Sequence, residues 1–323
     1  MKEKISLKAI WKILKDSLTG FADDKVMKMS SSLAYYTIFA MAPLLIIIIS
    51  LSGIFLGQEA AQGKVYEQLV SFIGTNSASQ LQEMIKNASL SGKSNVAAII
   101  GIVTLIIGAT TVFSEIQDSI NTIWGLKPKP KKGWLKFLKN RFLSFSIIIG
   151  LGFLLLVSLS ISTLIDSFSN SLKAYFPHAT VVLFYIINIV ITLVIITAIF
   201  ATIFKVLPDA KIKWKDVLIG SIFTAILFML GKFGISFYIS KSQVGSTYGA
   251  AGSLIILLVW VYYSSIILYF GAEFTKAFAM KFGSAIHPDD YAVTTKIVEI
   301  ESGNQSVQEK EKEKNEKKGN TYP

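Results

Sequence analysis

Long apolar runs separated by short lysine-rich blocks constrain this chain more than any other feature of its sequence. At about 1.5 Å per residue, each run can cross a hydrocarbon core of about 30 Å as a helix. The six runs cover residues 33–57, 96–118, 142–165, 180–204, 217–239 and 250–272. They lack the two-residue alternation of barrel strands. The sequence therefore predicts an all-α, polytopic membrane protein with six transmembrane helices.

The distribution of lysines predicts the orientation of these helices. Residues 1–32, 127–141, 205–215 and 273–323 together hold 26 basic residues, whereas the three intervening loops hold 5. Basic loops stay on the cytoplasmic side of a membrane. We therefore predict a multi-pass protein of the plasma membrane with both termini in the cytoplasm. The first run follows a long polar leader, so we predict a signal anchor rather than a cleaved signal peptide.

Composition divides the chain into three parts. Residues 1–32 form a cytoplasmic amphipathic segment, residues 33–282 the six-helix membrane domain, and residues 283–323 a cytoplasmic tail. From about residue 302 the tail is rich in Lys and Glu and almost free of apolar residues, which predicts disorder. In the first external loop, residues 58–95, apolar residues recur at helical spacing and predict short amphipathic helices. We see no repeat relating the two halves of the membrane domain.

The N-terminal segment is predicted to contain an amphipathic helix. Its apolar face comprises Leu7, Ile10, Trp11, Leu14 and Leu18, and the neighbouring face carries Lys4, Lys8, Lys12 and Lys15. This pattern fits a helix that lies in the cytoplasmic interface and is attracted to anionic headgroups. A helix packed beneath the bundle gives the same pattern, so both interpretations stay open.

Lys232 interrupts the fifth apolar run with a charge. A lysine near the centre of a span costs roughly 2.5–3.5 kcal/mol on insertion scales. One interpretation is a contact with an anionic group of a lipid or substrate within the bundle. The other is a structural lysine paired with carbonyl groups or with a carboxylate.

Three carboxylates lie towards the cytoplasmic ends of predicted spans. Glu115 and Asp118 are one turn apart in the second helix, which we expect to continue past Glu115 towards Trp124. Glu273 directly follows the sixth run. Such residues are usually interfacial caps. The alternatives are a proton- or cation-linked gate and salt bridges to the nearby basic loops.

Pro43 lies inside the first run, where it removes a helical hydrogen bond and predicts a kink. Tyr35 and Tyr36 precede it near the cytoplasmic boundary. The two tyrosines fit an aromatic belt at the membrane interface. A kinked helix that lines a cavity is the alternative.

Small residues open the sixth span. Gly245, Gly249 and Ser253 are spaced by four, which brings small side chains to one helix face and allows a neighbouring helix to approach closely. Helix packing is the default interpretation of this pattern. A flexible hinge on the outer side is the alternative.

Catalytic constellations are missing from the sequence. The chain has no cysteine, and its two histidines have no metal-ligand partner at a usable spacing. It contains neither a nucleophile elbow nor a phosphate loop. We therefore predict no catalytic residues, no metal and no cofactor. The basic segment Lys127–Lys139 contains aromatic residues, and beside a span it predicts contact with anionic lipid rather than nucleic acid.

Four stretches together resemble one family. They are LAYYTIFAMAPLL (residues 33–45), NTIWGLKPKPKKGW (121–134), LPDAKIKWKDVLIGS (207–221) and residues 231–274. They are similar to the YihY/virulence factor BrkB family of bacterial inner-membrane proteins over about residues 10–282. The resemblance implies six spans and an envelope role such as serum resistance or lipid export. An older description of the family as ribonuclease BN implies tRNA processing, but a metal-dependent nuclease needs clustered His, Asp or Glu ligands that this sequence does not offer.

The leading functional hypothesis is a non-enzymatic membrane protein that moves or exposes an amphiphilic, anionic substrate such as a lipid or lipid-linked molecule. An envelope scaffold that holds partner proteins and transports nothing is the alternative, and a tRNA nuclease is the third. A polar cavity near Lys232 favours transport, whereas a scaffold is compatible with a solid interior. The sequence specifies neither the substrate, the coupling ion nor the oligomeric state.

The predicted orientation can be tested with topology reporters. A reporter fused after Ser302 should be active only in the cytoplasm, and one inserted within residues 58–95 only outside. Alkaline phosphatase and a fluorescent protein give opposite readouts and check each other. External activity from the C-terminal fusion would contradict the six-span prediction.

Overall fold

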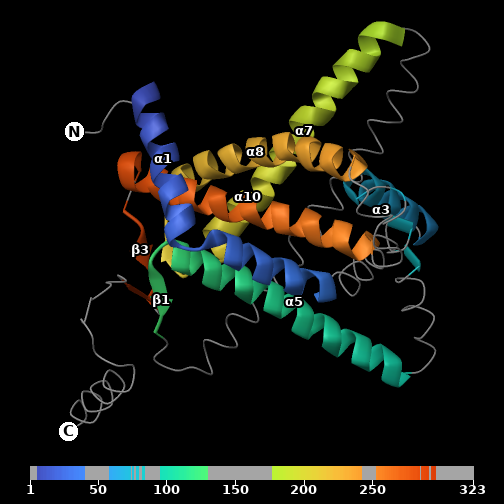
Figure 1. Cartoon of the computed structure of the whole chain (residues 1–323), viewed down its shortest axis with the longest axis horizontal. Helices are drawn as coiled ribbons and strands as arrows, with labels where there is room; N and C mark the ends of the chain where they lie inside the picture. Colours follow the sequence, from blue (N-terminus) through green and yellow to red (C-terminus); the bar gives the residue numbers. More distant parts are fainter. Residues whose placement is uncertain are drawn as a thin grey trace.

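The computed structural model shows long helices, several of which end beside short strands (Figure 1). We call this end of the molecule the lysine-rich end, because Lys127, Lys205 and Lys211 lie in or next to the strands. The described residues are 6–40, 58–73, 75, 78–79, 82–83, 95–129, 177–241, 252–283, 285–290 and 292–295. The helices are α1 (Leu7–Asp23), an unlabelled helix over residues 26–40, α3 (Gln58–Ile73), α5 (Asn95–Ile123), α7 (Pro177–Val206), α8 (Trp214–Lys241) and α10 (Gly252–Phe282). The strands are β1 (Leu126–Pro128), β2 (Ala210–Lys211), β3 (His287–Pro288) and β4 (Ala292–Thr294).

Among the described helices, three are long and apolar enough to cross a membrane. Their candidate spans are Ile186–Val206 in α7, Trp214–Ile235 in α8 and Leu254–Phe282 in α10. They coincide with the fourth, fifth and sixth predicted spans, so the chain is a membrane protein with multiple candidate spans. The third predicted span, residues 142–165, and most of the first lie outside the described residues.

Two further helices bear on the predictions. The second predicted helix does continue past Glu115, because α5 ends at Ile123. A helix is also confirmed in the loop predicted to be external, where α3 packs Val65 against Leu257 of α10. At 16 residues, α3 is longer than the short helices expected there.

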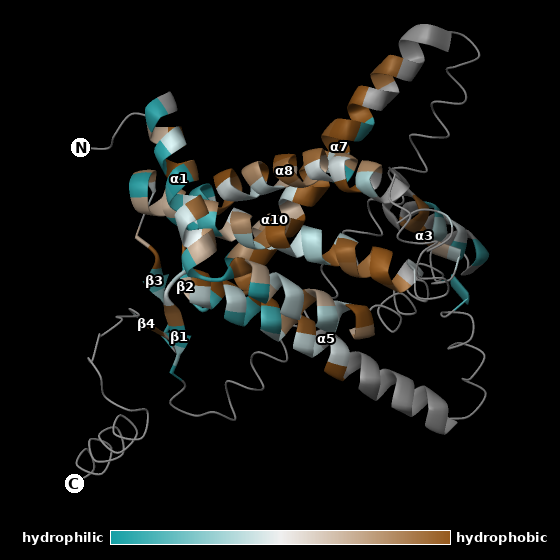
Figure 2. Ribbon diagram, viewed as in Figure 1, coloured by the Kyte–Doolittle hydropathy of each residue, from teal (hydrophilic) through white to brown (hydrophobic). Residues whose placement is uncertain are grey.

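Polar and apolar residues separate along the helices (Figure 2). Hydrophilic residues gather at the end where α1 and the strands lie, and apolar residues dominate the middle of α7, α8 and α10. Apolar side chains are exposed on the outside of α7, among them Val182, Val190 and Val194. An exposed apolar helix face of this kind is suited to contact with lipid tails.

Two short strand pairs join the loops at the lysine-rich end. β1 follows α5 and pairs antiparallel with β4, with Leu126 opposite Thr294. β2 lies between α7 and α8 and pairs antiparallel with β3, with Ala210 opposite Pro288. These strands are a departure from the all-α prediction. They pair backbone groups of three loops that the lysine count assigned to one side of the membrane.

The N-terminal helix α1 packs beneath the bundle. Ser6 caps it, because the Ser6 side chain accepts a hydrogen bond from the backbone nitrogen of Ala9. Its buried face includes Ala9 and Ile13, and Ile13 packs with Phe274 and Phe278 of α10. Small residues on this face allow the two helices to approach closely.

Of the apolar face predicted for α1, Leu14 packs against the cluster of Ile13 and the α10 phenylalanines, whereas three other residues are exposed. Trp11 is 72% exposed, Leu18 59% and Ile10 38%. Lys8, Lys12 and Lys15 are also exposed. The helix thus combines both interpretations of its sequence, with one face on α10 and an apolar, lysine-flanked face left open.

A repeated five-residue motif joins α8 to α10. Gly220–Thr224 reads GSIFT and Gly271–Thr275 reads GAEFT. A Cβ on Gly220 would lie 2.0 Å from Thr275 Oγ1, and a Cβ on Gly271 would lie 2.1 Å from Thr224 Oγ1. The two helices are antiparallel in this contact, so each glycine accommodates the threonine of the other helix. This local repeat within the second half of the chain was not predicted from the sequence.

The same contact is reinforced by hydrogen bonds and ring stacking. Thr224 donates to the Gly220 carbonyl and Thr275 to the Gly271 carbonyl, each at 2.7 Å, which satisfies hydroxyl groups that lipid cannot satisfy. The motif phenylalanines Phe223 and Phe274 stack with ring centroids 3.8 Å apart. We call Gly220, Thr224, Gly271 and Thr275 the glycine–threonine contact.

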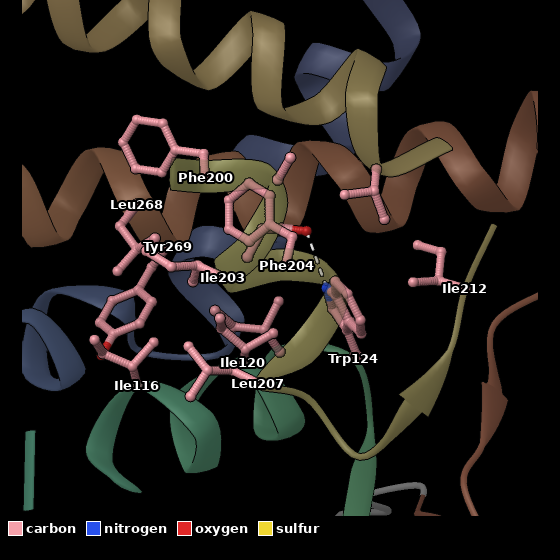
Figure 3. Close-up of a cluster of buried hydrophobic side chains, with 14 of the residues drawn as sticks. Ile116, Ile120, Trp124, Phe200, Ile203, Phe204, Leu207, Ile212, Leu268 and Tyr269 are labelled. Atoms are coloured by element: carbon pink, nitrogen blue, oxygen red, sulfur yellow. Dashed lines mark hydrogen bonds between the residues drawn. The ribbon is translucent and has the colours of Figure 1, made fainter. Parts of the chain in front are cut away.

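The main hydrophobic core lies where α5, α7, α8 and α10 meet (Figure 3). Ile120, Phe204 and Tyr269 are fully enclosed there. Trp124, just after α5, donates from Nε1 to the Ala272 carbonyl at 3.1 Å, the dashed line in Figure 3. The core therefore fixes the lysine-rich ends of four helices relative to one another.

Alanine substitutions test the glycine–threonine contact. Gly220→Ala or Gly271→Ala should lower the free energy of unfolding by about 1–3 kcal/mol, because the added methyl group forces the helices apart. Gly234→Ala is the matched control on α8, since a Cβ there meets nothing within 4 Å and alanine favours a helix. Thermal unfolding in detergent measures all three. Equal effects at Gly220 and Gly234 would contradict the close contact.

Candidate functional site

A line of polar side chains runs along α10 inside its candidate span. Ser265, Tyr269, Glu273 and Lys276 are spaced by four, four and three, so they lie on one helix face. Ser265 is 3% exposed, Tyr269 0% and Glu273 2%. We call these four residues the polar face of α10. Polar and ionisable groups enclosed within a membrane helix bundle often mark ion or substrate pathways.

Glu273 is the most buried of the Glu and Lys side chains among the described residues of α10. Gly20 of α1 lies directly over its carboxyl group, since a Cβ on Gly20 would be 2.5 Å from Glu273 Oε2. No described donor makes a hydrogen bond to Glu273 Oε1. Helix α1 therefore acts as the cover of this carboxyl group.

Lys276 forms ion pairs with two carboxylates beside this carboxyl group. The Lys276 Nζ atom lies 3.5 Å from Glu273 Oε2 and 3.5 Å from Oδ2 of Asp24, the C-terminal cap residue of α1. The Lys276 and Asp24 side chains are 29% and 21% exposed, so they connect the enclosed Glu273 to the surface of the lysine-rich end. We call Asp24, Glu273 and Lys276 the charge cluster.

The polar face continues one turn deeper at Tyr269. Its hydroxyl group is buried and faces Ser119 of α5 outside hydrogen-bond geometry. Glu115 and Asp118 lie near enough to act on it electrostatically. The two carboxylates predicted on α5 are thus brought towards a buried tyrosine of α10.

A second buried network holds the loop between α7 and α8. Asn121 donates to Asp209 Oδ2 at 3.1 Å and accepts from the Asp209 backbone nitrogen at 2.9 Å. Gln117 donates to Asp209 Oδ1 at 3.4 Å. Asn121 and Gln117 are 2% and 8% exposed and Asp209 is half-buried, so the network is partly shielded from water. Sequence reasoning missed it, and the only sequence signal was two amides one turn apart on an otherwise apolar helix face.

The other predicted residues are distributed more widely. Lys232 lies half-buried on α8, while Tyr35 and Tyr36 are 59% and 37% exposed on the helix over residues 26–40. Tyr35 contacts the ring of Phe39, which is 67% exposed, with centroids 5.0 Å apart. Ser253 lies at the start of α10. Pro43, Gly245 and Gly249 lie outside the described residues, as does any kink or hinge at them.

Among the described residues, no three His, Asp or Glu side chains gather as a metal-binding set. Asp216, 4% exposed in the first turn of α8, lies against Gly283, where a Cβ would be 2.5 Å from its carboxyl group. This contact packs the end of α10 against the start of α8.

Residues 17–290 match the family model described as virulence factor BrkB. The chain belongs to the virulence factor BrkB family. A UPF0761 membrane protein of Pseudoalteromonas atlantica is 28% identical over 80% of this chain and 83% of its own length. One of Photobacterium profundum is 27% identical over 92% and 89%.

Some relatives in this family are longer. A UPF0761 membrane protein of Saccharophagus degradans is 26% identical over 80% of this chain, which spans 58% of that relative. The relatives' names give a membrane location and no activity. No solved structure matches the chain. The BrkB match includes α1 from Ser17 onward, and it therefore contains Gly20 and the whole charge cluster.

Proposed function

We propose that this BrkB-family protein is a non-enzymatic membrane protein that moves or exposes an amphiphilic, anionic substrate such as a lipid or lipid-linked molecule. The observation that carries the proposal is the position of Lys232. It lies within the candidate span, nine residues, or roughly 13 Å, before the end of α8 at Lys241. A cation at that depth is costly unless it meets an anionic or polar partner.

The surroundings of Lys232 supply further polar character. The preceding residue, Gly231, is covered by Tyr263 of α10, whose hydroxyl oxygen would lie 1.1 Å from a Cβ on Gly231. A lysine and a phenolic hydroxyl group therefore occur at the same level of the α8–α10 pair. On the other side of α8, Phe233 and Phe237 are 68% and 67% exposed. A polar group beside an apolar, lipid-accessible surface suits an amphiphile with an anionic head.

The lysine-rich end supports the same class of ligand. The exposed face of α1 presents Trp11 and Leu18 together with three exposed lysines, Lys8, Lys12 and Lys15. Aromatic and aliphatic side chains insert between headgroups, and lysines attract anionic lipids by roughly 1 kcal/mol each near the surface. We propose that this face rests on the cytoplasmic leaflet.

The competing proposals make different demands. A scaffold needs an outward surface for partner proteins, and the exposed Tyr35 and Phe39 rings offer an aromatic one. It makes no use of a lysine within a span. A nuclease needs a cytoplasmic metal site, for which Asp209 and Asp216 are the nearest candidates in sequence. Asp209 is instead bound to Asn121, and Asp216 is enclosed by Gly283.

Lys232 variants test the transport proposal. In liposomes containing the fluorescent anionic lipid NBD-phosphatidylglycerol, Lys232→Met should reduce lipid movement about tenfold, because the variant keeps the bulk and loses the charge. Lys232→Arg should retain part of the activity. Lys215→Met, an exposed lysine at the start of the same helix, is the control and should behave like wild type.

Thermal stability in detergent separates the two roles of Lys232. A ligand-binding lysine can be replaced without loss of stability, whereas removing half of a structural ion pair strands its partner. A Met variant that is destabilised, and whose activity falls only with its abundance, would contradict a substrate contact.

A further inference from the structure

The charge cluster, which joins α10 to the end of α1, is not electrically balanced. With both carboxyl groups ionised, Asp24 and Glu273 contribute two negative charges and Lys276 one positive charge, so the cluster carries one net negative charge. Glu273 is 2% exposed, and water cannot compensate that charge as it would at a surface. One proton bound to a carboxyl oxygen makes the cluster neutral.

The geometry around Glu273 provides a position for that proton. The ionisable groups that face it are Asp24 from the end of α1 and Lys276 from α10, and the Asp24 and Glu273 carboxyl groups lie close enough to interact directly. Glu273 Oε1 has no hydrogen bond from any described donor. A carboxylic acid facing a carboxylate can donate the hydrogen bond that two carboxylates cannot form.

The cluster also lies between a wet end and a dry interior. Asp24 and Lys276 are partly exposed at the lysine-rich end, whereas Tyr269, one turn further along α10, is fully enclosed beside Ser119. From α5, Glu115 and Asp118 act on Tyr269. Proton carriers are therefore arranged in order from the surface into the bundle, along the polar face of α10.

We propose that Glu273 is a proton-binding site, reached through Asp24 and Lys276, and that the proton it binds is the coupling ion of the transport proposed above. A proton from the lysine-rich side adds to a carboxylate oxygen of Glu273 and changes the cluster from one negative charge to none. Its release restores the charge. The coupling of this proton to transport rests on the proposed function, whereas proton binding by Glu273 does not.

The position of α1 links this event to a structural change. The Glu273 carboxyl group lies beneath Gly20, with no room for a side chain between them. An ionised Glu273 carboxylate attracts water more strongly than a protonated one does. The charge state of Glu273 therefore changes how tightly α1 packs on α10. Protonation of Glu273 favours the close contact between α1 and α10. Ionisation of Glu273 favours entry of water between the two helices.

Infrared spectroscopy of the full-length protein in lipid nanodiscs tests proton binding without any substrate. Wild type should show a carboxylic-acid carbonyl band that disappears in one step on alkaline titration. Glu273→Gln, which has the same shape and cannot ionise, should lose this band, and Glu273→Asp should shift it. Glu115→Gln is the control and should retain it. Wild-type and Glu273→Gln spectra that coincide at every pH where the protein is folded would overturn the proposal.

A liposome assay with NBD-phosphatidylglycerol tests the coupling separately. An imposed pH gradient should accelerate lipid movement several-fold for wild type and leave Glu273→Gln unaffected. Movement at the same rate with and without the gradient overturns the coupling and leaves the proposed function intact. A titrating band without any lipid movement overturns the proposed function and leaves the proton site intact.

Discussion

A carboxyl group enclosed inside a membrane helix bundle has to be compensated where it lies, and this requirement organises the structure around Glu273. The lipid offers neither water nor hydrogen-bond donors. Compensation comes from Lys276 on the same helix, and the second carboxylate, Asp24, fixes the end of α1 beside it. Gly20 then allows α1 to close over the group. The N-terminal helix thus packs directly on α10 at this point.

The glycine–threonine contact sets the direction in which Glu273 points. Helices in lipid have little hydrophobic reason to associate, so close approach of small residues supplies the packing energy. The GAEFT motif of α10 faces α8 through Gly271 and Thr275, which leaves the glutamate between them on a different face, towards α1. The equivalent residue of the GSIFT motif, Ile222, is exposed to the outside. One local motif therefore has an apolar copy that faces lipid and an acidic copy that faces the interior.

Hydropathy was sufficient to predict the helices and insufficient to predict their contacts. The fifth predicted span, residues 217–239, lies within α8 and differs from it by three residues or fewer at each end. For the sixth, a carboxylate after an apolar run suggests an interface, and only packing shows that the helix α10 continues to Phe282 with Glu273 enclosed. The bond between Asn121 and Asp209 joins residues that are 88 positions apart, which no local pattern can reveal. Apart from Leu14, the face of α1 that packs was missed because small residues carry little hydropathy signal.

The account depends most on the interaction of Lys276 with Glu273, and a double-mutant cycle measures it directly. Unfolding in detergent would be compared at an alkaline pH at which Glu273 is ionised, for wild type, Lys276→Met, Glu273→Gln and the double variant. We expect Lys276→Met alone to be destabilised by about 2 kcal/mol, because it leaves two carboxylates without a cation, and the double variant to recover most of that loss. Additive effects of the two substitutions would show that the lysine does not compensate the buried carboxyl group and would contradict the account.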